Sequence, residues 1–530
     1  MAKEIKLRDY QEDIYAEIQS KEDVKKLLVV APCGAGKSIL IGKLANDLSE
    51  SGRVLILTHR VELLLQNYEW LNKAAVISSS TNTLRYDSKI VIGMVETVAA
   101  RYKKFGIKYL GDFSYVIVDE AHVDIFKKVY SKLKFERLIG FTASPLTNKR
   151  ETKEVDGVTY TRPLTMANEY DALVGSVSEK TLIEKGYLCQ DFNIVLRLPN
   201  IEKLKESDSD PDGYTRVSIN EVYNNTASFE ILAEAYNKYC KGKKTIIFNA
   251  NSKINLAVYQ FFLKLGVECK MYDSVNSTDM SRDEIVKWYE DTPGAVLINA
   301  NVFTTGFNVP DTEAIIFNRA TKSLSLWLQA IGRGARITDK IYKDMFTVID
   351  LGENIYEHGT FSLERNWQSM FVPQEWKRKR VLDLLKTWSC TFCEAINIVG
   401  EEHCCVCGME KADAVVIENG KKAKTGEFEA LTDMPLPKAN AIISYSIKNN
   451  QDGNFAFKLL EERVLELFVH YNVSKEFYIK NKDKFKIRIR QIYTPIYFAI
   501  LKNKFLHSSR KKLDTQMERM FRKIDAYYGC

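Results

Sequence analysis

The sequence lacks any long apolar run. No window approaches the roughly 18 apolar residues that a membrane-spanning helix needs, and the amino-terminal stretch MAKEIKLRDYQEDIY has no apolar core of signal-peptide length. Internal repeats and long low-complexity tracts are also missing. We therefore expect neither a membrane protein nor an exported one, and we expect several folded domains from 530 residues.

The net charge is also small, and the cysteines outside one cluster are mostly single. The chain has 76 basic and 69 acidic residues, and the resulting net charge of +7 is too small for this length to indicate a polyanionic partner by itself. Four of the ten cysteines stand at metal-ligand spacing between residues 390 and 407, and the others are mostly single. This pattern favours a reducing compartment and one metal site over a disulfide framework.

Short apolar runs alternate with amphipathic stretches along two parts of the chain. The first part predicts strands at 27–31, 54–58, 89–93, 115–119 and 137–143. The second part predicts strands at 245–250, 266–272, 295–300, 314–319 and 346–351. Alternating strand and helix signals are typical of parallel sheets covered by helices on both faces. The sequence therefore predicts two α/β domains in tandem.

The domain boundaries follow from where these patterns change. The polar segment 206–214 is rich in turn formers and predicts an exposed loop. The predicted divisions are a first domain at 1–170, a second at 171–355, a linker with a helix at 356–387, a four-cysteine module at 388–412 and a basic, aromatic, mainly helical region at 413–530.

A small-residue turn follows the first predicted strand. The turn reads Ala31-Pro32-Cys33-Gly34-Ala35-Gly36-Lys37-Ser38 and leads into a helix, which is the setting of a phosphate-binding loop. We expect the backbone N–H groups of 34–38 and the turn around Cys33 to surround the phosphates of ATP. Lys37 would reach the β- and γ-phosphates, and Ser38 would ligate Mg²⁺.

An acidic pair ends another predicted strand. In Val118-Asp119-Glu120-Ala121-His122 the strand would deliver Asp119 to Mg²⁺ and Glu120 to the water that attacks the γ-phosphate. With these two motifs, residues 1–352 resemble the superfamily 2 helicases of the DEAH-lettered kind. The resemblance implies two RecA-like domains that hydrolyse ATP between them.

The same resemblance assigns further residues of the first domain. Leu7-Arg8-Asp9-Tyr10-Gln11 is similar to the family's adenine-reading segment, with Gln11 contacting the base. Thr58 and Arg60 at one strand end, and Gly93 at another, match positions that grip the sugar–phosphate backbone. Ligands to open α/β sheets bind at such strand ends.

In the second domain the resemblance covers two segments. Residues 295–310 are similar to a segment that touches nucleic acid through Thr304 and Thr305 and the nucleotide through Gly306 and Asn308. The segment Gln329-Ala-Ile-Gly-Arg333-Gly-Ala-Arg336 matches the family's arginine motif. It implies Arg336 as the arginine finger, Arg333 at the γ-phosphate, and Gln329 positioning water or nucleotide.

Together with 184–188, these motifs look most like the DNA-repair and phage-recombination branch that includes the RadD and UvsW proteins. The resemblance implies an ATP-dependent DNA helicase or translocase in repair, recombination or replication, in a bacterial or phage-infected cytoplasm and near its nucleoid. DNA is favoured over RNA as the partner. The alternatives are an RNA helicase and an ATP-gated nucleic-acid-binding platform that does not unwind. We identify no endonuclease carboxylate–lysine cluster after Leu351.

The cysteine cluster has the spacing C-x2-C-x10-C-x2-C, which suits tetrahedral Zn²⁺. Its ligands would be Cys390, Cys393, Cys404 and Cys407. With Trp388 and Asn397 it resembles the RanBP2-type zinc finger. Ubiquitin-binding members of that family carry Thr-Phe after the second cysteine, where this chain has Glu394-Ala395, so we do not expect ubiquitin binding. A structural clip and a nucleic-acid reader both fit this module.

The carboxyl-terminal residues 475–530 hold 15 lysines and arginines against 5 acidic residues. Aromatic residues are interleaved with the basic ones, as in surfaces that follow phosphates and stack bases. A helical bundle with a solvated basic face explains the aromatics equally well. The charge excess favours contact with nucleic acid.

Overall fold

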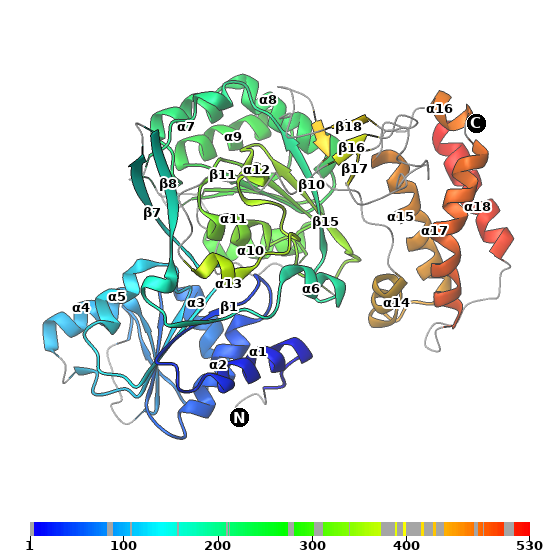
Figure 1. Cartoon of the computed structure of the whole chain (residues 1–530). Coiled ribbons are helices and arrows are strands. Elements are labelled where there is room, and N and C mark those ends of the chain that lie inside the picture. The colour runs from blue at the N-terminus through cyan, green and yellow to red at the C-terminus, as the bar shows by residue number, and fades with distance from the viewer. Residues whose placement is uncertain are drawn as a thin grey trace.

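The structure is a computed structural model of the whole chain (Figure 1). It describes the following residues: 5–81, 88–106, 109–155, 158–207, 210, 212–273, 280–300, 311–338, 340–372, 387–389, 396–398, 415–417, 428–430, 439–470, 475–480, 482–502 and 513–529. Two α/β domains lie beside each other, and a separate group of helices lies against the second (Figure 1).

The first domain contains a seven-stranded, entirely parallel sheet in the order β3-β4-β2-β5-β6-β1-β9. Its strands are β1 (Lys26–Val30), β2 (Val54–Thr58), β3 (Ala75–Ile77), β4 (Ile90–Met94), β5 (Tyr115–Asp119), β6 (Arg137–Thr142) and β9 (Ala172–Val174). Its helices are α1 (Asp9–Ser20), α2 (Lys37–Leu48), α3 (Val61–Tyr68), α4 (Val95–Phe105) and α5 (Lys127–Tyr130). The five predicted strands are confirmed. Their residues form continuous apolar runs because the central strands of a parallel sheet are buried on both faces.

The second domain contains another seven-stranded sheet, in the order β12-β13-β11-β14-β15-β10-β19. Its strands are β10 (Gln190–Leu196), β11 (Thr245–Asn249), β12 (Cys269–Tyr272), β13 (Val296–Ala300), β14 (Ala314–Asn318), β15 (Met345–Asp350) and β19 (Phe428–Ala430). All neighbours are parallel except β19, which is antiparallel to β10. The five strands predicted here are also confirmed.

Helices connect these strands, and polar caps mark where several begin. They are α6 (Glu179–Glu184), α7 (Arg216–Tyr223), α8 (Thr226–Ala235), α9 (Ser252–Lys264), α10 (Arg282–Asp291), α11 (Leu324–Ile331), α12 (Asn354–His358) and α13 (Trp367–Phe371). Ser281 forms a capping box with Glu284 at α10, and the Ser323 side chain accepts a hydrogen bond from Leu326 N–H at α11. Each cap pairs a backbone N–H that the first turn leaves without an intrahelical partner.

A β-hairpin that the sequence analysis did not predict follows β6 directly. Its strands, β7 (Leu146–Val155) and β8 (Val158–Thr165), pair antiparallel and run from the first domain alongside the second (Figure 1). One apolar cluster continues through both domains and includes Val30, Leu188, Ala335 and Trp367. The two domains therefore share a buried interface.

The structure differs from the predicted domain divisions at two places. Strand β9 lies after the predicted 170/171 boundary but completes the first sheet, and β19 lies within the predicted 413–530 region but completes the second. Both strands have only three residues, so neither carries enough periodicity to reveal which sheet it joins.

The segment around the cysteine cluster includes a small antiparallel sheet in the order β17-β16-β18. Its strands are β16 (Thr387–Ser389), β17 (Ile396–Ile398) and β18 (Val415–Ile417). Trp388 is the register partner of Asn397. The predicted zinc ligands lie outside the described residues: Cys390, Cys393, Cys404 and Cys407.

The last part of the chain is a group of helices with its own apolar core. They are α14 (Ala439–Lys448), α15 (Gly453–His470), α16 (Lys475–Lys480), α17 (Lys482–Lys502) and α18 (Leu513–Tyr528). Arg463 on α15 forms a buried ion pair with Asp344 of the second domain, with Nε 3.1 Å from Oδ1, and the Tyr342 hydroxyl donates to the same carboxylate. This contact attaches the helices to the segment just before β15. Among the described residues, no helix is both long and apolar enough to cross a membrane.

Candidate ATP site between the two domains

The turn between β1 and α2 can surround an anion with backbone N–H groups. Gly34 and Gly36 have φ values of 90° and 76°, in the left-handed region that glycine adopts without strain. A Cβ on Gly36 would lie 2.5 Å from Nε2 of Gln11, so a larger residue there would displace the Gln11 side chain. Helix α2 begins immediately after this turn, and the unpaired N–H groups and positive dipole end of a helix favour phosphate.

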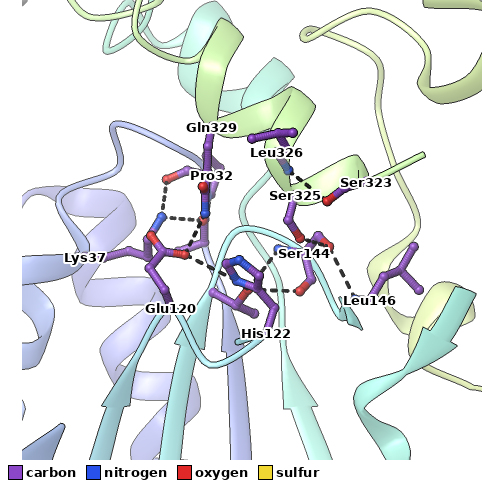
Figure 2. Close-up of polar contacts among 12 residues, drawn as sticks. Pro32, Lys37, Glu120, His122, Ser144, Leu146, Ser323, Ser325, Leu326 and Gln329 are labelled. Atoms are coloured by element: carbon purple, nitrogen blue, oxygen red, sulfur yellow. Dashed lines mark hydrogen bonds and ion pairs between the residues drawn. The ribbon is translucent and has the colours of Figure 1, made fainter. Parts of the chain in front are cut away.

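Lys37 is the first residue of α2 and extends back over the loop. Its Nζ lies 3.4 Å from the Ala31 carbonyl oxygen and 3.5 Å from that of Pro32 (Figure 2). Ser38 follows on the same turn. The structure therefore places the predicted phosphate-binding lysine and the predicted Mg²⁺-binding hydroxyl together at the edge of the first sheet.

Gln11 contacts the phosphate loop from α1. Its Nε2 donates to the Ala35 carbonyl at 2.9 Å, and its Oε1 accepts from Arg8 N–H at 3.0 Å. The ring of Tyr187 lies 4.8 Å from that of Tyr10, and the Arg8 guanidinium lies over Tyr187 at 5.1 Å from the ring centroid. The sequence analysis did not single out Tyr187 as a site residue. Aromatic rings and guanidinium groups can stack on a base, so these side chains extend the candidate base-binding end.

The acidic pair lies at the end of β5, beside the loop. Asp119 and Glu120 are buried, and Glu120 has φ 56°, a strained value for a residue other than glycine. Asn67 on α3 donates from Nδ2 to Asp119 Oδ2 at 2.8 Å. Burial and the adjacent Glu120 carboxylate raise the pKa of Asp119, and the Asn67 hydrogen bond opposes this shift.

Glu120 is surrounded by polar groups from both domains (Figure 2). Gln329 on α11 donates from Nε2 to Glu120 Oε2 at 3.0 Å, and His122 Nδ1 lies 3.5 Å from the same oxygen. Burial alone would raise the pKa of Glu120, but the charges of Lys37, the two nearby histidines and Arg333 outweigh it and lower the pKa. Glu120 is therefore a charged acceptor, as the base-like role predicted for it requires.

A second contact joins the domains next to this carboxylate. His122 Nδ1 is 3.2 Å from the Thr142 hydroxyl, and Thr142 donates to the Ser144 carbonyl at 3.0 Å. The Ser144 hydroxyl is 3.0 Å from the Ser325 hydroxyl at the start of α11 (Figure 2). The segment that follows β6 therefore connects Glu120 to the helix that carries Gln329.

The two predicted arginines lie after α11 against the phosphate loop. A Cβ on Gly34 would lie 3.7 Å from Arg336 Cγ, and one on Gly332 would lie 2.6 Å from Cys33 Cβ, so the loop and the arginine segment are in close contact. Burial, together with the adjacent Arg336, lowers the pKa of Arg333 to about 9. Two guanidinium groups so close together in a buried site favour an anion between the domains.

The candidate nucleic-acid residues of the first domain share one edge of the sheet. Leu57 pairs with Gly93 and Thr58 with Met94 in adjacent strands, and Arg60 precedes α3. Thr58 is fully buried. A Cβ on Gly93 would lie 2.6 Å from the Val98 side chain, so packing alone requires this glycine. The predicted residues of the second domain lie outside the described part of the chain: Thr304, Thr305, Gly306 and Asn308.

Comparisons with known proteins agree with this two-domain site. Residues 4–147 match the family described as type III restriction enzyme, res subunit, and residues 227–338 match the helicase conserved C-terminal domain. The chain has the two motor domains of a superfamily 2 helicase. These two matches support an ATP hydrolase of the superfamily 2 type, and the two parallel sheets are consistent with its RecA-like domains.

Three similar proteins each align with 63–72% of this chain. A 51.5 kDa protein of Lactococcus phage (isolate 7-9) is 25% identical over 385 residues, 72% of this chain and 77% of that protein. Saccharomyces cerevisiae IRC3, provisionally named an ATP-dependent helicase, is 27% identical over 374 residues, 65% of this chain and 51% of IRC3. The DNA 3'-5' translocase XPB2 of Sulfurisphaera tokodaii is 24% identical over 380 residues, 63% of this chain and 80% of XPB2. The chain thus matches only about half the length of IRC3.

The donor atoms at the site suit the ligands that such an ATPase uses. The Ser38 hydroxyl and the Asp119 carboxylate are hard oxygen donors of the kind that Mg²⁺ prefers. A bound cation would stabilise the charged form of the Asp119 carboxylate, which burial and the adjacent Glu120 disfavour. The loop, with its two left-handed glycines and the start of α2, suits the triphosphate.

Proposed function

We propose that the protein is an ATP-dependent DNA helicase or translocase that acts in repair, recombination or replication. The observation that carries this proposal is the hydrogen bond between Gln329 of the second domain and Glu120 of the first, 3.0 Å long and buried. Because it crosses between the domains at the candidate water-activating carboxylate, ATP hydrolysis depends on how the domains close. Opening and closing then changes the spacing of two strand-binding surfaces, which moves the protein along nucleic acid.

The predicted residues around the phosphate loop have separate roles in this cycle. Lys37 and the loop N–H groups bind the phosphates, Ser38 and Asp119 hold Mg²⁺, and Gln11 contacts adenine. When bound, Mg²⁺ neutralises charge on the β- and γ-phosphate oxygens. Glu120 accepts a hydrogen bond from the attacking water and orients its oxygen toward the γ-phosphorus.

Hydrolysis forms a bond from that water oxygen to the γ-phosphorus and breaks the bond to the bridging oxygen, which leaves with ADP. The proton that the water loses passes through Glu120 to the released phosphate. Arg336 and Arg333 stabilise the charge that spreads over the γ-phosphate oxygens and the leaving oxygen. Both arginines belong to the second domain, so this stabilisation requires closure.

DNA is the proposed track. Support comes from XPB2, a relative named as a DNA translocase, and from the arginine motif, which begins Gln329-Ala330 where RNA-specific DEAD-box enzymes usually have His-Arg. Arg60 is proposed to contact the DNA backbone from the first domain. The full burial of Thr58 and the packing of Gly93 against Val98 explain those two predicted residues without a DNA contact. An RNA helicase remains the alternative.

Two further parts are proposed to assist the motor. The four cysteines Cys390, Cys393, Cys404 and Cys407 would hold Zn²⁺ in a small module that serves as a structural clip or a nucleic-acid reader. The basic helix α17 would contact the phosphate backbone. Metal analysis of the purified protein tests the zinc proposal, with one equivalent expected per chain and none after Cys390→Ser with Cys393→Ser.

The decisive experiment measures ATPase rates with single-stranded DNA, forks, Holliday-type junctions and matched RNA. Stimulation by DNA above matched RNA supports the proposal, whereas stronger stimulation by RNA makes the protein an RNA helicase. No stimulation by any of them rejects the motor. Normal function of a Lys37→Ala protein in cells would instead indicate a binding platform.

A further inference from the structure

Helix α3 connects three functional regions of the motor. It begins directly after Arg60, the candidate DNA contact. In its first turn, Glu62 forms an ion pair with Arg282 of α10 in the second domain. In its last turn, Asn67 donates from Nδ2 to Asp119 Oδ2 at 2.8 Å. If this short helix moves as a rigid unit, a shift at its first turn reaches the Asp119 carboxylate.

The Asn67 side chain is not explained by packing. It is completely buried, and its Oδ1 accepts no hydrogen bond from any described residue. A buried acceptor without a partner is unfavourable, so side-chain packing by itself does not explain an amide at this position. The hydrogen bond to Asp119 also fixes which way the amide faces, because the reverse orientation would point Oδ1 at a carboxylate oxygen.

We propose that Asn67 is a positioning residue for the magnesium ligand. By donating to Oδ2, its amide fixes the rotation of the Asp119 carboxylate and leaves Oδ1 for the metal. Because α3 carries Glu62 and directly follows Arg60, DNA binding and domain closure change Mg²⁺ binding through this one hydrogen bond. Partners of this kind hold metal ligands in many sites, and their loss costs about 10–100-fold in metal affinity. This inference rests on the proposed role of Asp119 in holding Mg²⁺.

The test measures the affinity of the full-length protein for a fluorescent ADP analogue, once with Mg²⁺ and once with EDTA. For Asn67→Ala we expect the Mg²⁺-dependent gain in affinity to fall about 10-fold, with the affinity in EDTA unchanged. Asn67→Gln keeps the amide donor and should restore part of the gain. Half-maximal ATPase activation should also require about 10-fold more Mg²⁺ in the alanine variant.

Asn46→Ala is the matched control. Asn46 Nδ2 donates to the Trp70 carbonyl at 2.9 Å, just beyond α3, and its Oδ1 accepts from Asn72 N–H. This variant removes a hydrogen-bonded side-chain amide near the same helix and leaves the hydrogen bond between Asn67 and Asp119 in place. Its melting temperature should fall while its Mg²⁺ gain stays at the wild-type value. If Asn67→Ala does not fold, Asn67→Ser, whose hydroxyl is too short to span the distance, gives the same readout.

Asp119→Asn distinguishes a failure of the proposed Mg²⁺ site from a failure of the proposed role of Asn67. If it keeps the Mg²⁺ gain, Asp119 is not the metal ligand and the proposed site is wrong. If Asp119→Asn loses the gain but Asn67→Ala keeps it, the site stands and the positioning role of Asn67 is rejected. A DNA stimulation factor that is unchanged in Asn67→Ala would overturn the link through α3.

Discussion

The two halves of the ATP site differ in where their side chains find partners. In the first domain, Asp119 is held by Asn67 from the same domain. In the second domain, Gln329 makes its hydrogen bond to Glu120 across the interface. The first half is therefore formed by the folding of one domain, whereas the second half forms only on closure. Nucleotide binding should depend on the first half and hydrolysis on both.

The largest expected effect tests this separation in the second domain. Arg336→Ala should lower kcat by about 10⁴-fold, because the charge on the transferring phosphoryl group loses its arginine. Affinity for ADP, which the first domain supplies, should change little. Arg336→Lys should not restore the rate, since an ammonium group lacks the planar fork. Single-turnover ATPase and equilibrium ADP binding measure both quantities, and an equal loss in the two would contradict the division.

The next test changes the first domain at the carboxylate that meets the second. Glu120→Gln should lower kcat by about 10³-fold, because the attacking water loses its charged acceptor. The loop and Lys37 are untouched, so ATP should still bind and be retained. A filter-binding assay with labelled ATP checks retention, and loss of binding would show that Glu120 also shapes the phosphate site.

A third test uses pH to probe the first domain alone. Burial lowers the pKa of His59 from 6.5 to about 4, with Glu120 opposing and Arg60 adding to the shift. Between pH 6.5 and 4, His59 is protonated in the unfolded chain but neutral in the folded protein. This contribution to stability is therefore present above pH 6.5 and is lost as pH falls toward 4. Between pH 7.5 and 4.5 it amounts to about 2–3 kcal/mol.

His59→Gln should remove that part of the pH dependence. Melting temperatures of the wild-type and variant proteins at pH 7.5 and 4.5 measure the difference. All other titrating groups are common to both proteins, so their contributions cancel. A wild-type protein that loses no more stability than the variant over this range would show that His59 is protonated normally in the folded state.

The comparison of the two halves also shows what a sequence can reveal. The central strands and the phosphate loop were predictable because parallel strands form continuous apolar runs and the loop needs glycine at fixed positions. Strand β10 was missed because its buried residues include Asp191 and Asn193, which interrupt the apolar signal. Strand β9 was missed because three residues carry no period.

Within the site, local motifs were easier to predict than contacts between them. Asp119 follows a strand and was found, but Asn67 is one polar residue on an amphipathic helix, 52 residues away in sequence, with no motif around it. Tyr187 was likewise missed, because only folding brings it against Tyr10. A single sequence shows which residues could do chemistry, whereas pairing them across the fold requires the structure.

The smallest expected effect concerns the contact between the halves. Gln329→Ala removes the hydrogen bond to Glu120 and should lower kcat about 10-fold, since a hydrogen bond to a charged group contributes about 1.5–3 kcal/mol. Ser325→Ala, which removes the neighbouring contact with Ser144 but leaves Glu120 its partner, is the matched control and should lower kcat less. If Gln329→Ala affected ADP affinity more than kcat, closure would contribute to binding as well as to hydrolysis, and the two halves could not be assigned separate roles. Stopped-flow measurement of both constants on each variant decides between these outcomes.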